Sequence, residues 1–164
     1  MPVFELTNRL QGDIGEVVFE HYCRHKSFYK NPFLYIRTRD ILDYFSPKNF
    51  LPFKFENKVI KVRIPDEIED EIRRVCKTSN YNLNSPTFTP DYLSVPMGSF
   101  FDEVDEKIKQ VKDVPAKYFN WIEVKTNESP LSENQEELKK SSKIGLKVFR
   151  IKAEFPKEFE IIKE

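Results

Sequence analysis

The stretch Phe119–Thr126 constrains the fold most strongly, because its aromatic and β-branched residues predict a strand that nevertheless carries two charges. Glu123 and Lys125 are two positions apart, so they share one face of this strand. Ile122 and Val124 point to the other face, which we expect to be the core side. A carboxylate and an ammonium group held side by side on a rigid strand can serve a metal ion and a nucleophilic water.

The Glu-x-Lys spacing carries little information by itself, because 33% of the residues are charged. The same spacing recurs at 56–58, in a polar turn between two apolar runs, and at 137–139, in a stretch of helical composition. Only the copy at 123–125 is flanked on both sides by strand-forming apolar residues. The alternative interpretation of that copy is a surface ion pair on an edge strand, which would stabilise the protein by less than about 1 kcal/mol.

Bulk properties favour one globular domain spanning 1–164, since 164 residues with 39% hydrophobic content can bury a single core. The 27 basic residues equal the 27 acidic residues in number, so no net charge draws the protein toward nucleic acid or an anionic membrane. Two cysteines are too few for a disulfide framework. We see no apolar run of about 18 residues and no leader-like start, and therefore expect a cytoplasmic protein without a membrane partner.

The first predicted helix covers 12–26, where apolar residues recur at helical spacing. Glu16 lies away from their stripe and shares a second face of the helix with Phe19 and Cys23. That face is either partly covered, or Glu16 is an ordinary first-turn acid favoured by the helix dipole. The expected core stripe consists of Ile14, Val17, Val18, His21 and Tyr22.

Two histidines on this helix, His21 and His25, are four residues apart, and such a pair can bind zinc. Cys23 points to the other side of the helix, however, and no third ligand cluster is visible in the sequence. We favour a packed His21 and a solvated His25 over a zinc site.

The remaining pattern predicts alternating helices and strands. Asp91 follows a proline, which suits the start of a strand or an edge position. Gln135 stands three residues after Ser132, which is the spacing of a capping box. The expected helices are Thr38–Phe45, Asp66–Lys77, a charged segment over 102–111 and Ser132–Lys143, and the expected strands are Phe53–Phe55, Val59–Ile64, a strand-like segment over 86–95, a final core strand over 146–151 and an edge strand within 155–164.

The strongest local concentration of basic residues follows the predicted capping box. We expect it to lie close to Lys125 and to supply the contacts to any nucleic acid. Its members are Lys139, Lys140, Lys143, Lys147 and Arg150.

Taken in chain order, these features resemble the PD-(D/E)XK nuclease superfamily: a helix with Glu16, a strand with Pro90-Asp91, a strand with Glu123-Val124-Lys125, a helix with Gln135 and a closing strand. The helix start Leu131–Gln135 is most similar to that of virus-type replication-repair nucleases and, more distantly, of archaeal Holliday-junction resolvases. The resemblance covers about 12–22 and 86–152. It implies an α/β fold with a restriction-endonuclease-like αβββαβ core, meaning a mixed sheet flanked by helices, formed by about 12–26 and 86–152 with insertions at about 28–85 and 98–118.

The resemblance implies a nuclease that hydrolyses DNA phosphodiester bonds with Mg²⁺ or Mn²⁺. Asp91, Glu123, the Val124 carbonyl and Glu16 would hold the metal ion, since hard divalent cations take oxygen ligands. Lys125 would orient water or stabilise developing charge, and Gln135 would position water or phosphate. Carboxylates brought together in this way should have raised pKa values in the absence of metal.

Asp91 and Glu123 are 32 positions apart, where the superfamily usually has a tight hairpin, so the 98–118 segment must loop out of the sheet. Two other functions stay open: a non-catalytic nucleic-acid-binding module on the nuclease fold, and an unrelated α/β interaction protein. Carboxyl groups of Asp91 and Glu123 more than about 8 Å apart would favour the latter, because one ion could not bridge them. The preferred DNA structure and a homodimeric state are left open.

Overall fold

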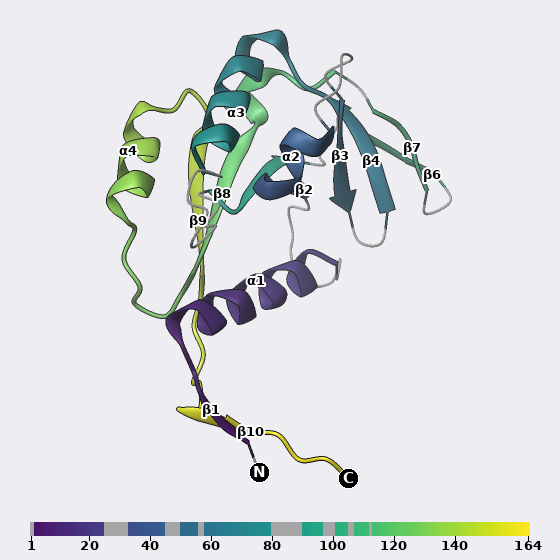
Figure 1. Cartoon of the computed structure of the whole chain (residues 1–164). Coiled ribbons are helices and arrows are strands. Elements are labelled where there is room, and N and C mark those ends of the chain that lie inside the picture. The colour runs from purple at the N-terminus through teal and green to yellow at the C-terminus, as the bar shows by residue number, and fades with distance from the viewer. Residues whose placement is uncertain are drawn as a thin grey trace.

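The fold is organised around a six-stranded mixed sheet with the strand order β4-β3-β2-β5-β8-β9 (Figure 1). In this computed structural model the described residues are 2–24, 33–44, 50–55, 58–79, 90–96, 101–104, 107–111 and 113–164. Neighbouring strands are antiparallel except for β8 and β9, which are parallel. The six strands are β2 (Phe33–Arg37), β3 (Phe50–Phe55), β4 (Lys58–Arg63), β5 (Tyr92–Pro96), β8 (Asn120–Thr126) and β9 (Gly145–Ile151).

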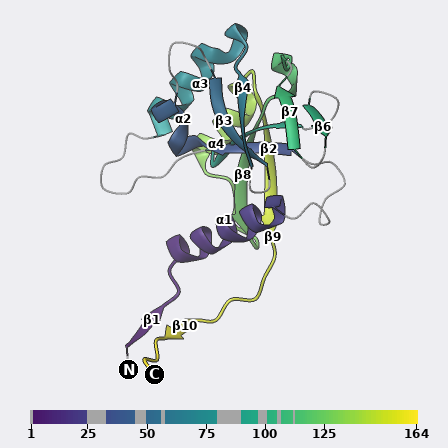
Figure 2. The same cartoon turned by 90° about the vertical axis from the view of Figure 1, so that its right-hand side faces the viewer.

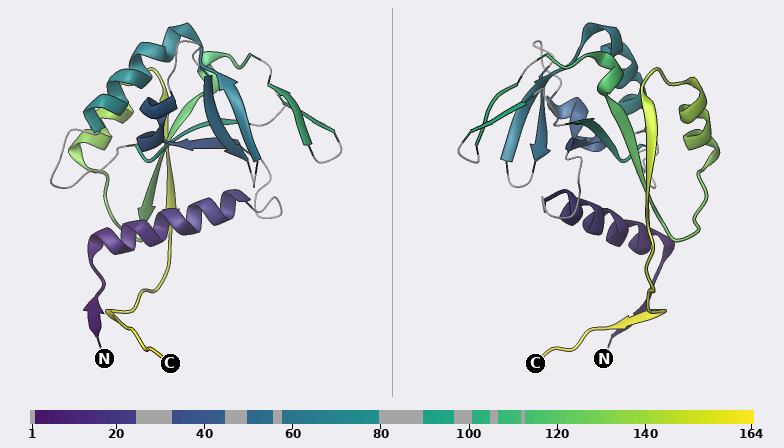
Figure 3. Two further views of the ribbon diagram at one scale, coloured as in Figure 1. Left: turned by 45° about the vertical axis from the view of Figure 1, so that its right-hand side comes forward. Right: turned by 180° about the vertical axis from the view of Figure 1, so that it is seen from behind.

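Helices cover both faces of this sheet (Figures 1 and 3). Among the described helices, α1 (Asn8–Arg24) is the one that crosses the first face. The other face is covered by α2 (Thr38–Tyr44), α3 (Asp66–Ser79) and α4 (Glu133–Ser141). A short 3-10 turn, Ala116–Tyr118, leads into β8.

The alternation of side chains along the strands produces two cores rather than one. The larger core lies under α2, α3 and α4, and the fully buried Trp121 belongs to it. The smaller core lies under α1 and contains Ile122 and Val124 together with an aromatic group around Phe19 and Tyr92. The prediction that only the Ile122 side of β8 faces a core is therefore wrong, and Glu123 is buried as well.

Two further two-stranded sheets stand outside the main sheet. Strands β1 (Val3–Glu5) and β10 (Glu158–Glu160) pair near the two termini, at a distance from the body of the molecule (Figure 2). Strands β6 (Phe101–Val104) and β7 (Lys107–Val111) pair with each other. Across the described part of the chain, no helix combines the length and the apolar character needed to cross a membrane.

The helices at 38–45, 66–77 and 132–143 and the strand pair at 53–64 are confirmed with small shifts of their ends. The charged helix expected over 102–111 is wrong, because 101–104 form β6 and 107–111 form β7. The β-branched residues Val104, Ile108 and Val111 favour that hairpin over a helix. The segment does leave the main sheet, as the spacing of Asp91 and Glu123 requires.

Three expectations about sheet membership also need correction. The 28–85 segment is not an insertion outside the core, since β2, β3 and β4 supply half of the main sheet. The closing strand β9 lies at the edge, and each of its residues is at least partly exposed. The tail contributes β10, which pairs with β1 rather than with the main sheet.

The predicted apolar stripe of α1 is wrong for three of its members, because Val17, Val18 and His21 are exposed, the first two by 63% and 43%. The helix instead buries Gly15, Phe19 and Cys23. The aromatic core under α1 selects this face, with the Phe19 ring 4.9 Å from that of Tyr92. The second face inferred for Glu16 is thus the covered one.

Two glycines of α1 offer a matched test of this packing. A Cβ at position 15 would lie 2.7 Å from Thr126 Cγ2, whereas a Cβ at position 12 would meet nothing within 4 Å. Gly15→Ala should lower the free energy of unfolding by about 1–2 kcal/mol, because the stiff Thr126 side chain must move. Gly12→Ala should raise it by up to about 1 kcal/mol through helix propensity. Urea unfolding of both variants measures these changes, and an equal gain in stability from both would contradict the close approach of α1 to β8.

Candidate active site

Asp91 lies where the main sheet opens between β5 and β8. The last pair of that ladder is Tyr92 with Ile122, whereas β8 continues to its end without β5 beside it. The Asp91 carboxylate takes the place of a strand carbonyl here, because its Oδ2 accepts a hydrogen bond from the Val124 backbone N–H at 2.7 Å. Continuing the same antiparallel register puts Asp91 opposite Glu123. The β5–β8 pairing therefore brings these two acids together.

Glu123 is 4% exposed and points to the side of the sheet covered by α4. Its Oε1 accepts a hydrogen bond of 2.5 Å from Nε2 of Gln135, and Nζ of Lys125 lies 3.8 Å from the same oxygen. Its Oε2 is buried and accepts no hydrogen bond of ordinary geometry from the described residues. A buried carboxylate oxygen left in this way is unfavourable, which is typical of a group prepared for a ligand or a proton.

Gln135 has two functions in the structure, one at each end of its amide. Its side-chain Oε1 accepts a hydrogen bond from the Ser132 backbone N–H at 2.7 Å. The Gln135 backbone N–H donates to Ser132 Oγ, which completes the predicted capping box. Its Nε2 is the donor to Glu123. The cap that starts α4 therefore also aims a side chain at the site.

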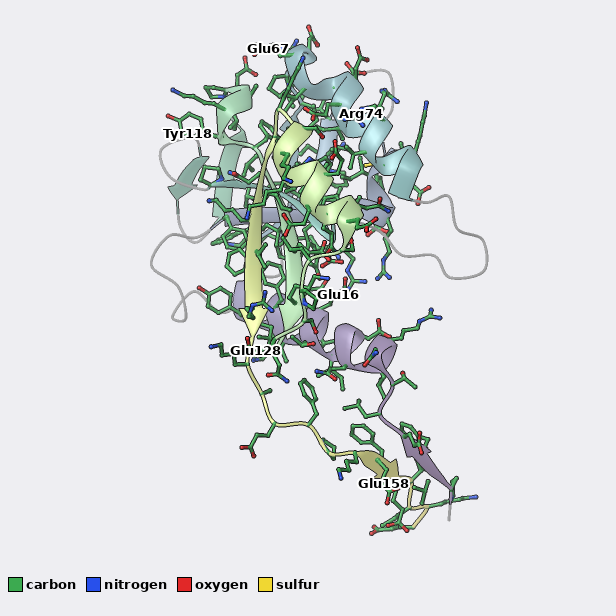
Figure 4. The ribbon with its side chains drawn as sticks, turned by 90° about the vertical axis from the view of Figure 1, so that its left-hand side faces the viewer. Glu16, Glu67, Arg74, Tyr118, Glu128 and Glu158 are labelled. Carbon is green, nitrogen blue, oxygen red and sulfur yellow. The ribbon has the colours of Figure 1, made fainter. Side chains whose placement is uncertain are left out.

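Glu16 belongs to α1, on the other side of the sheet, and is labelled in Figure 4. Its carboxyl group shares a hydrogen bond with that of Asp91. Asp91 also lies against Glu123, with which its backbone and side chain both interact. The three carboxyl groups thus form a continuous row with Asp91 in the middle, at the opening in the sheet.

Burial raises the pKa of each of these three carboxyl groups. The pKa of Asp91 lies well above its usual range because of burial, and the neighbouring Glu123 and Glu16 charges raise it further. Burial raises the pKa of Glu123 to about 7, although the Lys125 charge opposes the change. Burial also raises the pKa of Glu16, against the effect of its hydrogen bond with Asp91 and of the Arg37 charge. The expectation of raised pKa values in the cluster is confirmed.

A buried ion pair beside this row was missed in the sequence analysis. Glu20 is 6% exposed and accepts hydrogen bonds from Nε and Nη2 of Arg37, the latter at 2.6 Å. The Tyr92 hydroxyl also donates to Glu20, at 3.3 Å. The four-residue spacing of Glu16 and Glu20 puts both on one helix face and could have indicated Glu20. Nothing in the sequence pairs Glu20 with an arginine on a strand.

The row and the ion pair together hold an excess of negative charge. When every group is ionised, four carboxylates face two cations, so two negative charges remain in a partly buried space. Two protons or one divalent cation would cancel this excess. The members are Glu16, Glu20, Asp91, Glu123, Arg37 and Lys125.

The predicted basic patch is divided in the structure. Lys139 and Lys140 are exposed near the end of α4, and Lys143 is exposed in the following turn. Lys147 and Arg150 are three apart on β9, so they point to opposite faces of the sheet. Nη1 of Arg150 donates to the carbonyl oxygens of Asn127 and Ser129 at 2.7 Å each, which ties β9 to the loop after β8.

The zinc interpretation of α1 finds no support. Cys23 is buried, and burial raises the pKa of its thiol to about 12, so it is protonated at neutral pH. The expectation of a packed His21 is wrong, because this residue is exposed, and the expected solvated His25 lies outside the described residues. Across the described residues as they stand, no group of three or more His, Cys, Asp or Glu side chains is arranged to hold a metal ion. In this structure the Asp91 carboxyl group is instead engaged within the protein, with the Val124 N–H and with Glu16.

Comparison with known proteins gives no assignment: no family model, no curated protein and no solved structure matches this chain. Any function must therefore be argued from the site itself.

Raised pKa values make a prediction about pH and stability. The folded-state pKa of Glu123 is about 7, above its ordinary value of 4.5, so the folded protein binds more protons than the unfolded chain between these pH values. Without divalent cations, the free energy of unfolding should fall as the pH rises through about 7. Glu123→Gln should flatten this dependence and melt higher than the unaltered protein at about pH 8.

The matched control is Glu136→Gln, which replaces an exposed glutamate on α4 in the same way. Thermal melts across the pH range measure the effect. Equal pH dependence of the unaltered protein and Glu123→Gln would show that Glu123 is not a proton-binding member of the cluster.

Proposed function

We propose that this protein is a metal-dependent nuclease that hydrolyses phosphodiester bonds in DNA. The observation that carries the proposal is the buried Glu123 carboxylate, whose Oε2 accepts no hydrogen bond of ordinary geometry from the described residues, in a row with Asp91 and Glu16 and with Lys125 Nζ 3.8 Å from its Oε1. Burying several carboxyl groups together lowers the stability of a protein, and clusters of this kind are typical of catalytic sites.

The arrangement of elements around the site supports the proposal. Among the elements between α1 and α4 in the chain, the strands β2, β5 and β8 are consecutive neighbours in the sheet. We take α1, these three strands, α4 and β9 as the proposed αβββαβ core, and β9 runs parallel to β8. The segment with β3, β4 and α3 and the β6–β7 hairpin extend this set without entering between its strands.

The residues present fit a hard divalent cation such as Mg²⁺ or Mn²⁺. Carboxylate oxygens are the preferred ligands of these ions, and an ion of charge two would cancel the excess negative charge of the site. Asp91 and Glu123 would hold it together with the Val124 carbonyl, and Glu16 would complete the set. A bound cation would polarise a phosphoryl oxygen and lower the pKa of a coordinated water.

The chain's own residues have separate tasks in this proposal. Lys125, held beside Glu123, would orient the attacking water or stabilise charge that develops on the phosphate. Gln135 fixes the Glu123 carboxylate through its amide and leaves Oε2 for the ligand. The Asp91–Val124 hydrogen bond fixes the opening between the strands, so that the acids approach from rigid elements.

The cations at the end of α4 are the proposed DNA contacts. Lys139 and Lys140 are exposed on α4, the helix whose first turn contacts the site through Gln135, and Lys143 is exposed in the turn that follows α4. Arg150 contributes less than its place in the sequence indicates, because one end of its guanidinium binds two carbonyl oxygens of the protein.

Cleavage of labelled single-stranded, duplex, flap and four-way-junction DNA with Mg²⁺ or Mn²⁺ tests the function. Glu123→Ala and Lys125→Ala should each lower the rate by about 10²-fold or more, since each removes a group that acts on the reacting phosphate. Glu137→Ala and Lys61→Ala are matched controls at exposed positions of α4 and β4 and should cleave normally.

Metal-dependent cutting that is lost in both site variants and kept in both controls would support the proposal. No cutting of any DNA by the unaltered protein would overturn it in favour of a binding module. Cutting that survives both substitutions would remove this site from the reaction.

Salt dependence tests the DNA-binding surface separately. Replacing both Lys139 and Lys140 by Gln should lower the slope of log affinity against log salt by about 2, because each phosphate contact contributes about 0.9. The control Lys61→Gln/Arg63→Gln removes two exposed cations from β4, at the far edge of the sheet, and should leave the slope unchanged. A slope that changes only in the control would put the DNA on the other edge.

A further inference from the structure

Glu20 is a buried carboxylate to which the proposed reaction assigns no task. It lies one helical turn after Glu16 on α1, and it is 6% exposed. Burying a carboxylate is unfavourable unless it is paired and hydrogen-bonded. Here the pairing is complete, because Arg37 and the Tyr92 hydroxyl together donate to both of its oxygens.

The pairing with Glu20 fixes the orientation of the Arg37 guanidinium. Nε and Nη2 of the guanidinium engage the two carboxylate oxygens side by side, which sets the plane of the group. Tyr92 is the cross-strand partner of Arg37 and packs against Phe19 of α1. Burial and the nearby Glu20 and Glu16 carboxylates raise the pKa of Tyr92, so its hydroxyl keeps its proton and stays a donor.

Part of the Arg37 side chain remains open to a ligand, since the side chain is 27% exposed. Among the described residues, none accepts a hydrogen bond from Nη1 of Arg37. Arg150 provides a contrast, because its Nη1 is bound to two backbone carbonyl oxygens. A guanidinium with a fixed plane and unengaged N–H groups is well suited to a phosphate oxygen.

Arg37 lies next to the row of acids. Arg37 is the last residue of β2, and the next backbone N–H, that of Thr38, donates to the Asp91 carbonyl oxygen at 2.9 Å. Its charge also acts on Glu16. Arg37 therefore flanks the row of acids from the α1 side, while Lys125 flanks it from the α4 side.

A row of acids repels the phosphate that it is proposed to bind. Resting on the proposed nuclease function, we propose that Arg37, held in place by Glu20, contacts a non-bridging oxygen of the substrate phosphate at this row. Glu20 and Tyr92 are then positioning residues that fix the guanidinium. The two cations on either side of the row would receive the phosphate between them.

DNA binding in Ca²⁺ provides a readout other than cleavage. The probe is a fluorescein-labelled oligonucleotide of the structure that the unaltered protein cleaves fastest, followed by anisotropy over a range of salt. Arg37→Gln should lower the salt slope by about 1, as expected for one lost phosphate contact. Arg73→Gln is the matched control, because Arg73 forms a comparable ion pair with Glu69 on α3 with a side chain 33% exposed.

A second variant guards against misfolding. Arg37→Gln leaves Glu20 buried without its cation, whereas Glu20→Gln/Arg37→Gln leaves no such charge and should give the same loss of slope. Arg37→Lys keeps the charge but lacks the planar fork, so it should keep most of the slope and still lower the cleavage rate by about 10-fold or more.

The outcomes separate this inference from the function on which it rests. A salt slope and cleavage rate that Arg37→Gln and the double variant leave unchanged, with the unaltered protein active, would overturn the role of Arg37 alone. Failure of the unaltered protein to bind or cut DNA with any metal would overturn both. Loss of slope in both Arg37 variants but not in Arg73→Gln would establish the contact.

Discussion

β5 begins at Tyr92, opposite Ile122, and β8 continues beyond this pair without β5 beside it. The Asp91 carboxylate accepts the Val124 N–H that a neighbouring strand would otherwise bind, and this hydrogen bond of 2.7 Å keeps the sheet open at that point. Backbone hydrogen bonds between fully paired strands would occupy this space. The acids can therefore meet only at the opening where the β5–β8 pairing ends. Glu123 and Gln135 come to it from one face of the sheet, and Glu16 comes from the other.

The consequence of this opening is a concentration of charge that the fold does not neutralise. Lys125 balances part of Glu123, and Arg37 is engaged with Glu20. Burial, and then the neighbouring Glu123 and Glu16 charges, hold the pKa of Asp91 well above its usual range, which favours protonated acids in the row. Binding of a divalent cation would replace those protons and relieve the repulsion. In the proposed metal site, the same feature that lowers stability would therefore favour binding of the cation.

Much of the candidate site could be predicted from the sequence because its chemistry lies in short local patterns. Glu123 and Lys125 stood out as charges in a strand, and Gln135 stood out as half of a capping box. Their convergence depends on the antiparallel pairing of β5 with β8 across 32 positions, which no local pattern specifies. Arg37 was missed for the same reason, since its partner Glu20 is on another element.

The errors in the predicted fold arose where local preference and tertiary packing disagree. Val17 and Val18 fit an apolar stripe, yet α1 rotates them outward because Gly15 permits a closer approach to β8 and Phe19 joins the aromatic core. The strands of the 28–85 segment had recognisable patterns, but only their pairing with β5 shows that they belong to the main sheet.

The central claim is that clustered, partly protonated carboxyl groups form a site for a divalent cation. Proton release on adding Mg²⁺ to the unaltered protein near pH 7 tests it most directly, by calorimetry in buffers of different ionisation enthalpy. We predict saturable binding with protons released to the buffer, and loss of both in Asp91→Asn. Binding without proton release, or no binding at all, would contradict the account.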